Sequence, residues 1–225
     1  MKGRTLGMYF AAVAAGLACA ALSTAAGAQE AAQDSRMGSQ IAMRSGANQA
    51  DAQSVIQSWP ETTKKAGQNL IEKYGQPDGV TDRMLVWNDR QPWKQVAVFR
   101  DPVKHNQPMP HEDYIENTVS FKVPENKVAD LAKFDHALVV DQTRVTLASH
   151  CDSESSNTLA LNLANEIVTG KRDVASAKSL LHSTLMKGVA GKSSPLMDKL
   201  QFEPSSSTGE ETVPRSEIKK GYWRP

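Results

Sequence analysis

The stretch Ile115-Glu116-Asn117-Thr118-Val119-Ser120-Phe121-Lys122-Val123 has the most regular residue pattern in the chain. Apolar or amide side chains at the odd positions alternate with charged or hydroxyl side chains at the even positions. Successive side chains of a strand point to opposite faces of a sheet, so this stretch predicts a β-strand with one buried and one solvated face. Such alternation is typical of an antiparallel sheet that is covered on one side.

The residues on either side of this strand predict the remainder of an antiparallel sheet. Four further segments are rich in Val, Leu, Trp or Phe and are bounded by turn residues, which is the pattern of short strands: 84–87, 93–99, 137–140 and 145–151. The last two flank Asp141-Gln142-Thr143-Arg144 and predict a hairpin. Residues 102–110 are dense in proline, so we expect a loop there, between the second and third strands.

Helix signals lie before, between and after these strands. Ser58-Trp59-Pro60-Glu61 has the form of a capping box with proline in the first turn, and Gly75 is placed to end that helix. Pro124, Asp152 and Asp173 predict three later helix starts. Locally paired strands with interleaved helices indicate an α+β fold. We expect a mainly antiparallel sheet of about five strands with helices packed on one face.

The predicted helix after Asp152 has a row of uncharged polar residues along one side: Thr158, Asn162, Asn165 and Thr169. An ordinary solvent-facing side is the expected interpretation. The alternative is that these side chains hydrogen-bond a neighbouring loop or a partner.

The first 28 residues predict export. Lys2 and Arg4 precede an uncharged, alanine-rich run from 6 to 26, and an A-x-A motif ends at Ala28. This is the pattern of a secretory signal peptide cleaved after Ala28, and it predicts a periplasmic location. A membrane anchor or a lipoprotein modified at Cys19 are the alternatives, but the run is weakly hydrophobic for a span and Leu17 lies one place too close to Cys19.

Composition divides the rest of the chain into three parts. Residues 29–50 are rich in Ala, Gln, Ser and Gly and predict a disordered lead-in. We expect a single α+β domain over 51–200 and a flexible C-terminal tail over 201–225. The tail ends in Tyr222-Trp223-Arg224-Pro225, aromatics that either dock on a surface or belong to a frayed end.

Charge and cysteine content exclude several classes of protein. The chain has 26 basic and 25 acidic residues, and loss of Lys2 and Arg4 with the signal leaves no basic excess. We therefore expect no nucleic-acid binding and no stable membrane insertion after cleavage. Of the two cysteines, Cys151 alone remains in the mature chain, so an intramolecular disulfide is impossible. A buried, unpaired thiol is expected there.

The segment His105-Asn-Gln-Pro-Met-Pro-His111-Glu112-Asp113 contains the best candidate for a functional site. Imidazole and carboxylate groups are ligands of divalent metals, and prolines stiffen a loop. The sequence therefore offers His105, His111 and Asp113 as candidate ligands of a metal ion, with Glu112 as the candidate base. The H-x5-H spacing matches no defined zinc motif, so solvated loop residues are the alternative. A further ligand would have to come from His136 or His150.

The other motifs of catalysis are missing from the sequence. It contains no G-x-S-x-G nucleophile elbow, no G-x-G-x-x-G fingerprint and no C-x-x-C pair. His150 and Cys151 are neighbours in a predicted strand and point to opposite faces, so they cannot chelate one ion together. A pair between Cys151 and a distant histidine is the remaining thiol chemistry, against an inert buried thiol.

Four blocks resemble a set of exported bacterial proteins of unknown activity. They are the KYG-x-P block at 73–77, the PWK block at 92–94, the HN-x-P-x-PH-x-D block at 105–113 and the LNLA-x-EI block at 161–167. The K-Y-G-x-P helix end is also similar to that of small periplasmic lipoproteins of outer-membrane assembly. The first resemblance implies that the His105 segment and the Asn162 helix belong to a shared pattern, and it implies no particular activity.

Two functions are compatible with these observations. The first is a periplasmic accessory, assembly or binding module without catalytic activity, which acts with another periplasmic protein. The second is a metal-binding protein or metal-assisted hydrolase that uses the His105–Asp113 segment. The sequence favours the first, with no cofactor, and leaves the ligand and the oligomeric state open.

Overall fold

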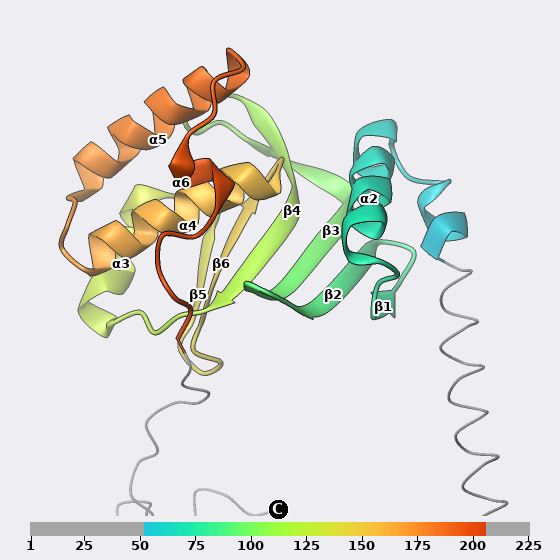
Figure 1. The fold of residues 1–225 in the computed structure, drawn as a ribbon, viewed down its shortest axis with the longest axis horizontal. Helices are drawn as coiled ribbons and strands as arrows, with labels where there is room; N and C mark the ends of the chain where they lie inside the picture. Colours follow the sequence, from blue (N-terminus) through green and yellow to red (C-terminus); the bar gives the residue numbers. More distant parts are fainter. Residues whose placement is uncertain (1–51, 206–225) are drawn as a thin grey trace, which may run out of the picture. The chain divides into compact units, whose positions relative to one another are not determined.

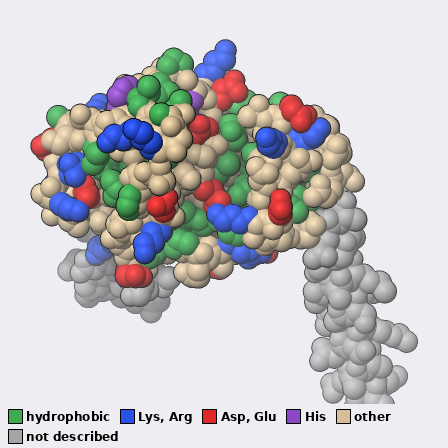
Figure 2. Space-filling view, turned by 45° about the horizontal axis from the view of Figure 1, so that its top comes forward, with side chains coloured by type: hydrophobic (Ala, Val, Ile, Leu, Met, Phe, Trp, Pro, Cys, Tyr) green, Lys and Arg blue, Asp and Glu red, His purple; other side chains and the backbone are tan. Residues whose placement is uncertain are grey.

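The computed structural model describes residues 52–205 (Figure 1). The predicted signal peptide, the predicted lead-in and the aromatic end of the tail lie outside the described residues. Within those residues, no helix combines the length and the apolarity that crossing a bilayer requires. On the face seen in Figure 2, acidic and basic side chains are interspersed, in line with the balanced composition.

One antiparallel sheet forms the centre of the domain. Its strand order is β1-β2-β3-β4-β6-β5, and every neighbouring pair is antiparallel. The strands are β1 Gly79–Val80, β2 Met84–Arg90, β3 Trp93–His105, β4 His111–Ser120, β5 Leu138–Asp141 and β6 Thr146–Cys151. The predicted antiparallel sheet is confirmed. The additional strand is β1, whose two residues are too few to produce a sequence pattern.

The helices cover one face of this sheet. They are α2 Glu61–Tyr74, α3 Glu125–Phe134, α4 Glu154–Val168, α5 Val174–Val189 and α6 Pro195–Asp198, and a short helical stretch at 52–56 precedes them. Helix α2 packs against β2 and β3, and α4 packs against β4 and β6, with α5 and α6 lying outside α4 (Figure 1). In β4, Ile115, Asn117 and Val119 are buried and the residues between them are half-buried. The predicted α+β class, with one covered face, is therefore confirmed.

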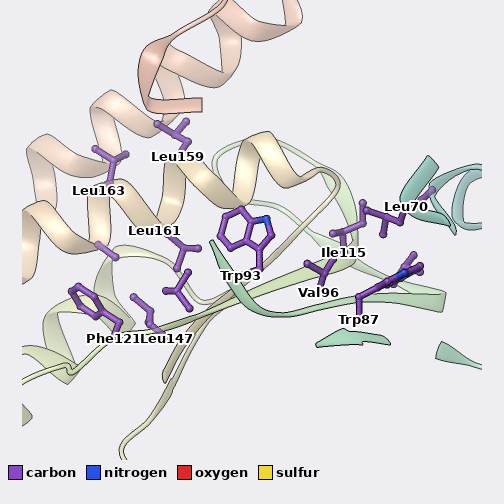
Figure 3. Packing of buried hydrophobic residues seen from close by; sticks show 14 of the residues in the cluster. Leu70, Trp87, Trp93, Val96, Ile115, Phe121, Leu147, Leu159, Leu161 and Leu163 are labelled. Atoms are coloured by element: carbon purple, nitrogen blue, oxygen red, sulfur yellow. The ribbon is translucent and has the colours of Figure 1, made fainter. Parts of the chain in front are cut away.

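Helix α4 is buried on nearly all sides. Leu161 points toward the sheet, whereas Leu159 and Leu163 point away from it (Figure 3). All three side chains are inaccessible to solvent, because α4 contacts β4 and β6 on the side of the sheet and α3, α5 and α6 on its other sides. The expected solvent-facing side of this helix was wrong for Thr158 and Asn162, which are both buried.

The helix ends follow local sequence signals with two corrections. Gly75 ends α2 with a φ of 77°, and the Asp173 carboxylate accepts a hydrogen bond from the Ser176 N–H at the start of α5. The N-cap of α4 is Ser153, not Asp152. No side chain caps α2, because the hydroxyl of Ser58 donates to the Val55 carbonyl instead.

The predicted loop over 102–110 was wrong for residues 102–105, which belong to β3, and is confirmed for residues 106–110. Strand β3 continues to His105 and β4 begins at His111, so residues 106–110 alone connect them. The register of β3 against β4 shifts between Val98 and Val103, and Pro102 lies inside this irregular part. Proline lacks the N–H that a ladder needs and is tolerated at such bulges, so its presence did not end the strand.

Residues 195–205, called here the C-terminal strap, close the domain over α4. The Asn162 side chain bonds three backbone groups of the strap, and the Phe202 ring packs edge-on against Phe121 at 5.2 Å between ring centroids. The Ser205 N–H donates to the carbonyl of Ser120 at the end of β4. The domain therefore extends at least to Ser205, beyond the predicted tail boundary at residue 201.

Candidate metal centre

The bulge in β3 places the two histidines of the candidate site side by side. Val98 pairs with Ile115 and Val103 pairs with Asp113, so β3 advances five residues where β4 advances two. An odd excess of residues reverses the alternation of side chains between the two faces of a strand. As a result His105 and His111 are direct cross-strand partners, with ring centroids 4.9 Å apart.

Asp113 lies between the two imidazoles. It is two residues beyond His111 in β4, so both side chains point to the same face. One carboxylate oxygen, Oδ2, is 3.1 Å from His105 Nδ1, and the other, Oδ1, is 2.9 Å from His111 Nε2. One ligand atom from each residue lies within 4.8 Å of the others. This brings together the three residues that the sequence predicted as candidate ligands.

The cluster is shielded from solvent. The side chains of His105, His111 and Asp113 are 16%, 14% and 6% exposed. Both nitrogens of His105 and the Oδ1 atom of Asp113 are buried and make no hydrogen bond within the described residues. The two histidine rings nevertheless lie within ion-pair distance of the Asp113 carboxylate. Buried polar atoms without a partner lose the free energy of hydration, about 1–3 kcal/mol each. A bound cation would supply the missing partner.

His111 is held in one orientation by the backbone. Its Nδ1 lies 2.7 Å from the carbonyl of Met109, so Nδ1 carries the hydrogen and donates it. In the neutral ring the Nε2 lone pair then points at Asp113 Oδ1, another acceptor, 2.9 Å away. Two acceptors at this distance need a cation between them, either a proton or a metal ion. A backbone bond that fixes the second ring nitrogen is also the usual arrangement around a metal-ligating histidine.

Burial raises the pKa of the Asp113 carboxyl above its ordinary value. His111 and His105 lower it, but Asp135 and Asp152 lie near enough to raise it further. The negative charges of this region favour the arrival of a cation, and protons compete with any metal for the same oxygen atoms.

Cys151 lies next to this cluster. It pairs with Ile115 across the β4–β6 ladder and therefore faces the same side as Asp113 and His111. Its Sγ is 3.4 Å from His111 Nε2 and 3.7 Å from Asp152 Oδ1. Burial, and then the charges of Asp152 and Asp113, raise the pKa of the thiol well above its usual range. The expected inert thiol is thus half-buried and adjoins a histidine.

A cavity of about 300 Å³ opens beside His111 and Cys151. Methionine and aliphatic side chains line much of it, among them Met109, Leu185, Val189 and Met197. Val189 is well exposed at the rim, so the cavity connects the thiol side of the cluster with the surface. The end of α5 and the strap form the outer wall of this cavity. The sequence pattern did not predict that either segment lies beside His111 and Cys151.

The remaining sequence candidates lie elsewhere. Glu112 is exposed and pairs with Lys104, on the opposite face from its neighbours His111 and Asp113. His136 is exposed. His150 pairs with Glu116, so it lies on the opposite face of the ladder from Cys151, and its ring is 5.2 Å from that of Phe99. Burial, and then the nearby His105, lower the pKa of His150. The sequence left open a pair between Cys151 and a distant histidine without naming that histidine, because no local signal relates a strand residue to His111, forty positions upstream.

The fold and this cluster define an α+β domain with a buried histidine–aspartate group beside a thiol. No family model, no curated protein and no solved structure matches the chain. The resemblance to exported bacterial proteins therefore stays a prediction. The function has to be argued from the residues of this chain.

Proposed function

We propose that the protein is an exported metal-binding protein that holds one divalent transition-metal ion at His105, His111 and Asp113. The observation that carries this proposal is the convergence of three ligand atoms within 4.8 Å in a shielded part of the domain. Exposed acidic and histidine side chains often gather by chance, whereas this cluster is buried and leaves polar atoms without hydrogen bonds.

The chemistry of the donors favours a transition metal. Imidazole nitrogen suits Zn²⁺, Cu²⁺, Fe²⁺ and Ni²⁺, whereas Mg²⁺ and Ca²⁺ prefer sites made wholly of oxygen. Two imidazoles and one carboxylate are also a common set of three protein ligands for zinc. The Met109 carbonyl, which orients His111, would act as the outer partner that such sites use.

Metal binding is better supported than metal-assisted hydrolysis. The base suggested by the sequence, Glu112, faces away from the cluster. The nearby carboxylate of Asp152 already accepts a hydrogen bond from Ser156 Oγ at 3.0 Å. A binding role also agrees with the accessory or binding module expected from the sequence, and association with another exported protein stays part of that prediction.

The test is a metal titration of the full chain, expressed without a histidine tag and recovered from the periplasm. Protein stripped of metal by a chelator is titrated with Zn²⁺ by calorimetry, and the bound metal is counted by mass spectrometry. We expect one equivalent for the unmodified protein and at least a 100-fold weaker affinity for H105A/H111A. The matched control is H136A/H182A, which removes two exposed histidines and should bind as the unmodified protein does.

Equal zinc content in H105A/H111A and in the unmodified protein would contradict the proposal, and so would the absence of stoichiometric binding. The native mass spectrum of the same sample also reports the cleavage site and any co-purifying subunit. It therefore tests the predicted removal of residues 1–28 in the same experiment.

A further inference from the structure

The sulfur of Cys151 lies within reach of the proposed metal. We propose that Cys151 is the fourth ligand and that the site consequently selects a thiophilic ion of the Zn²⁺ type over Mg²⁺, Ca²⁺ and Mn²⁺. This inference rests on the proposed function, since it needs a metal held by His105, His111 and Asp113. It adds a ligand from a third strand. The three-residue cluster favours transition metals in general, and the added sulfur restricts the metal to the thiophilic ones.

The distance between Cys151 and His111 fits a tetrahedral site. With Zn–S near 2.3 Å and Zn–N near 2.0–2.1 Å, sulfur and nitrogen ligands at a tetrahedral angle lie about 3.6 Å apart. The Cys151 Sγ and His111 Nε2 atoms are separated by 3.4 Å. Asp113, which the same histidine nitrogen contacts, is buried and has an oxygen without a hydrogen bond, so it points to a cation in this position independently of the cysteine.

A small movement of the cysteine completes the set. The thiol is not part of the group of atoms that lie within 4.8 Å of one another, so it must turn about χ1 toward the cluster. Its present contact with Asp152 Oδ1 is 3.7 Å long and therefore weak. Cys151 is the last residue of β6, and Cys151 and His111 both line the 300 Å³ cavity, so the sulfur has free space on the His111 side.

The ligation step is a proton exchange. The Cys151 S–H bond breaks, the sulfur lone pair forms a bond to the metal, and the proton leaves to solvent. Thiolate is a soft donor, so it adds little affinity for hard ions and much for Zn²⁺, Co²⁺ or Cu⁺. Methionine sulfur at Met109 and Met197 lines the same cavity, and the one carboxylate of its lining, Asp152, already accepts a hydrogen bond from Ser156 Oγ at 3.0 Å.

Cobalt(II) substitution tests the ligand directly. Co²⁺ takes the place of Zn²⁺, and a thiolate ligand produces a sulfur-to-cobalt charge-transfer band in the near ultraviolet. We expect this band when the metal-free full chain is titrated with Co²⁺. We expect C151S to retain one cobalt, seen by its visible d–d bands, while it loses the charge-transfer band and binds Zn²⁺ at least 10-fold more weakly. The second variant, C151A, repeats the test without the serine hydroxyl of C151S, which could itself contact the metal.

The outcomes separate this inference from the proposed function. Stoichiometric cobalt without the charge-transfer band would overturn the role of Cys151 and leave the three-ligand site intact. No cobalt or zinc binding would overturn both proposals. The unmodified protein supplies the decisive spectrum, so a folding defect in a variant cannot hide the answer. As an independent measure, bound Zn²⁺ should slow alkylation of Cys151 by a small maleimide at least 10-fold, and unchanged alkylation would contradict ligation.

Discussion

Asn162 shows what one buried amide does for this fold. It lies on the outer side of α4 and is 1% exposed. Its Nδ2 donates to the carbonyls of Leu196 and Lys199, each at 2.9 Å, and its Oδ1 accepts from the Gln201 N–H at 2.7 Å. These bonds hold the C-terminal strap against α4, where the backbone of the strap is not paired with a strand of the sheet. The sequence shows a polar residue at position 162 and leaves open whether water or protein groups hydrogen-bond its side chain.

Replacing Asn162 with alanine should destabilise the domain by about 2 kcal/mol. The reason is that three backbone groups of the strap lose this hydrogen bond in a place that water reaches poorly, and of the three the Lys199 carbonyl keeps a bond from the Gln201 side chain. Urea unfolding of the full chain measures the change. The control is N165A on the same helix, because Asn165 is half-buried and no side-chain hydrogen bond of it is found within 52–205; we expect a loss below about 0.5 kcal/mol. Equal losses in both variants would show that the strap bonds contribute little.

At the scale of the element, the turn between α4 and α5 is held by one carboxylate. Glu166, near the end of α4, accepts from Lys171 Nζ and Arg172 Nε, each at 2.6 Å. The Arg172 N–H also bonds the Glu166 carbonyl. Burial opposes ionisation of this carboxyl, but the hydrogen bonds and charges of Lys171 and Arg172 outweigh it, so the pKa of Glu166 is lowered.

A lowered pKa in the folded state makes this turn sensitive to acid. The stabilisation from Glu166 is fully present above the ordinary carboxyl value of 4.5 and is lost as the pH falls through the lower folded value. We expect E166Q to be less stable than the unmodified protein at pH 7 and to approach it below pH 4.5. Urea midpoints measured from pH 7 to pH 3 give the comparison. A constant difference across this range would contradict the ionic role of Glu166.

At the scale of the whole molecule, the proposed metal connects three adjacent strands. His105 belongs to β3, His111 and Asp113 to β4, and Cys151 to β6. These strands are neighbours in the sheet. An ion held at this place would therefore oppose separation of the strands during unfolding.

Metal should raise the melting temperature of the domain. A ligand that binds the folded state alone adds about 2.7 kcal/mol at a free concentration one hundred times its dissociation constant. We expect excess Zn²⁺ to raise Tm by several degrees and a chelator to reverse the change. H105A/H111A should melt at one temperature with or without zinc, whereas H136A/H182A should respond fully. A zinc-dependent rise in the Tm of H105A/H111A would show that the stabilising ion binds at another place.

Local patterns were enough to predict the class of fold. The alternation over 115–123 predicted a sheet with one covered face, because side-chain direction in a strand follows directly from the sequence position. Gly75 and Asp173 marked helix ends, because capping depends on a few neighbouring residues. The candidate ligands His105, His111 and Asp113 were also recognisable, since their chemistry is a property of the residue type.

The geometry of the site depended on contacts between distant residues. Proline indicated a loop, yet the pairing of β3 with β4 extended both strands, and the bulge between Val98 and Val103 turned His105 toward His111. Register across a ladder, and the layer of α5 and strap over α4, are decided by packing between segments far apart in the chain. For that physical reason the sequence by itself determined the sheet and the candidate ligands, and only the tertiary structure brought Cys151 to them.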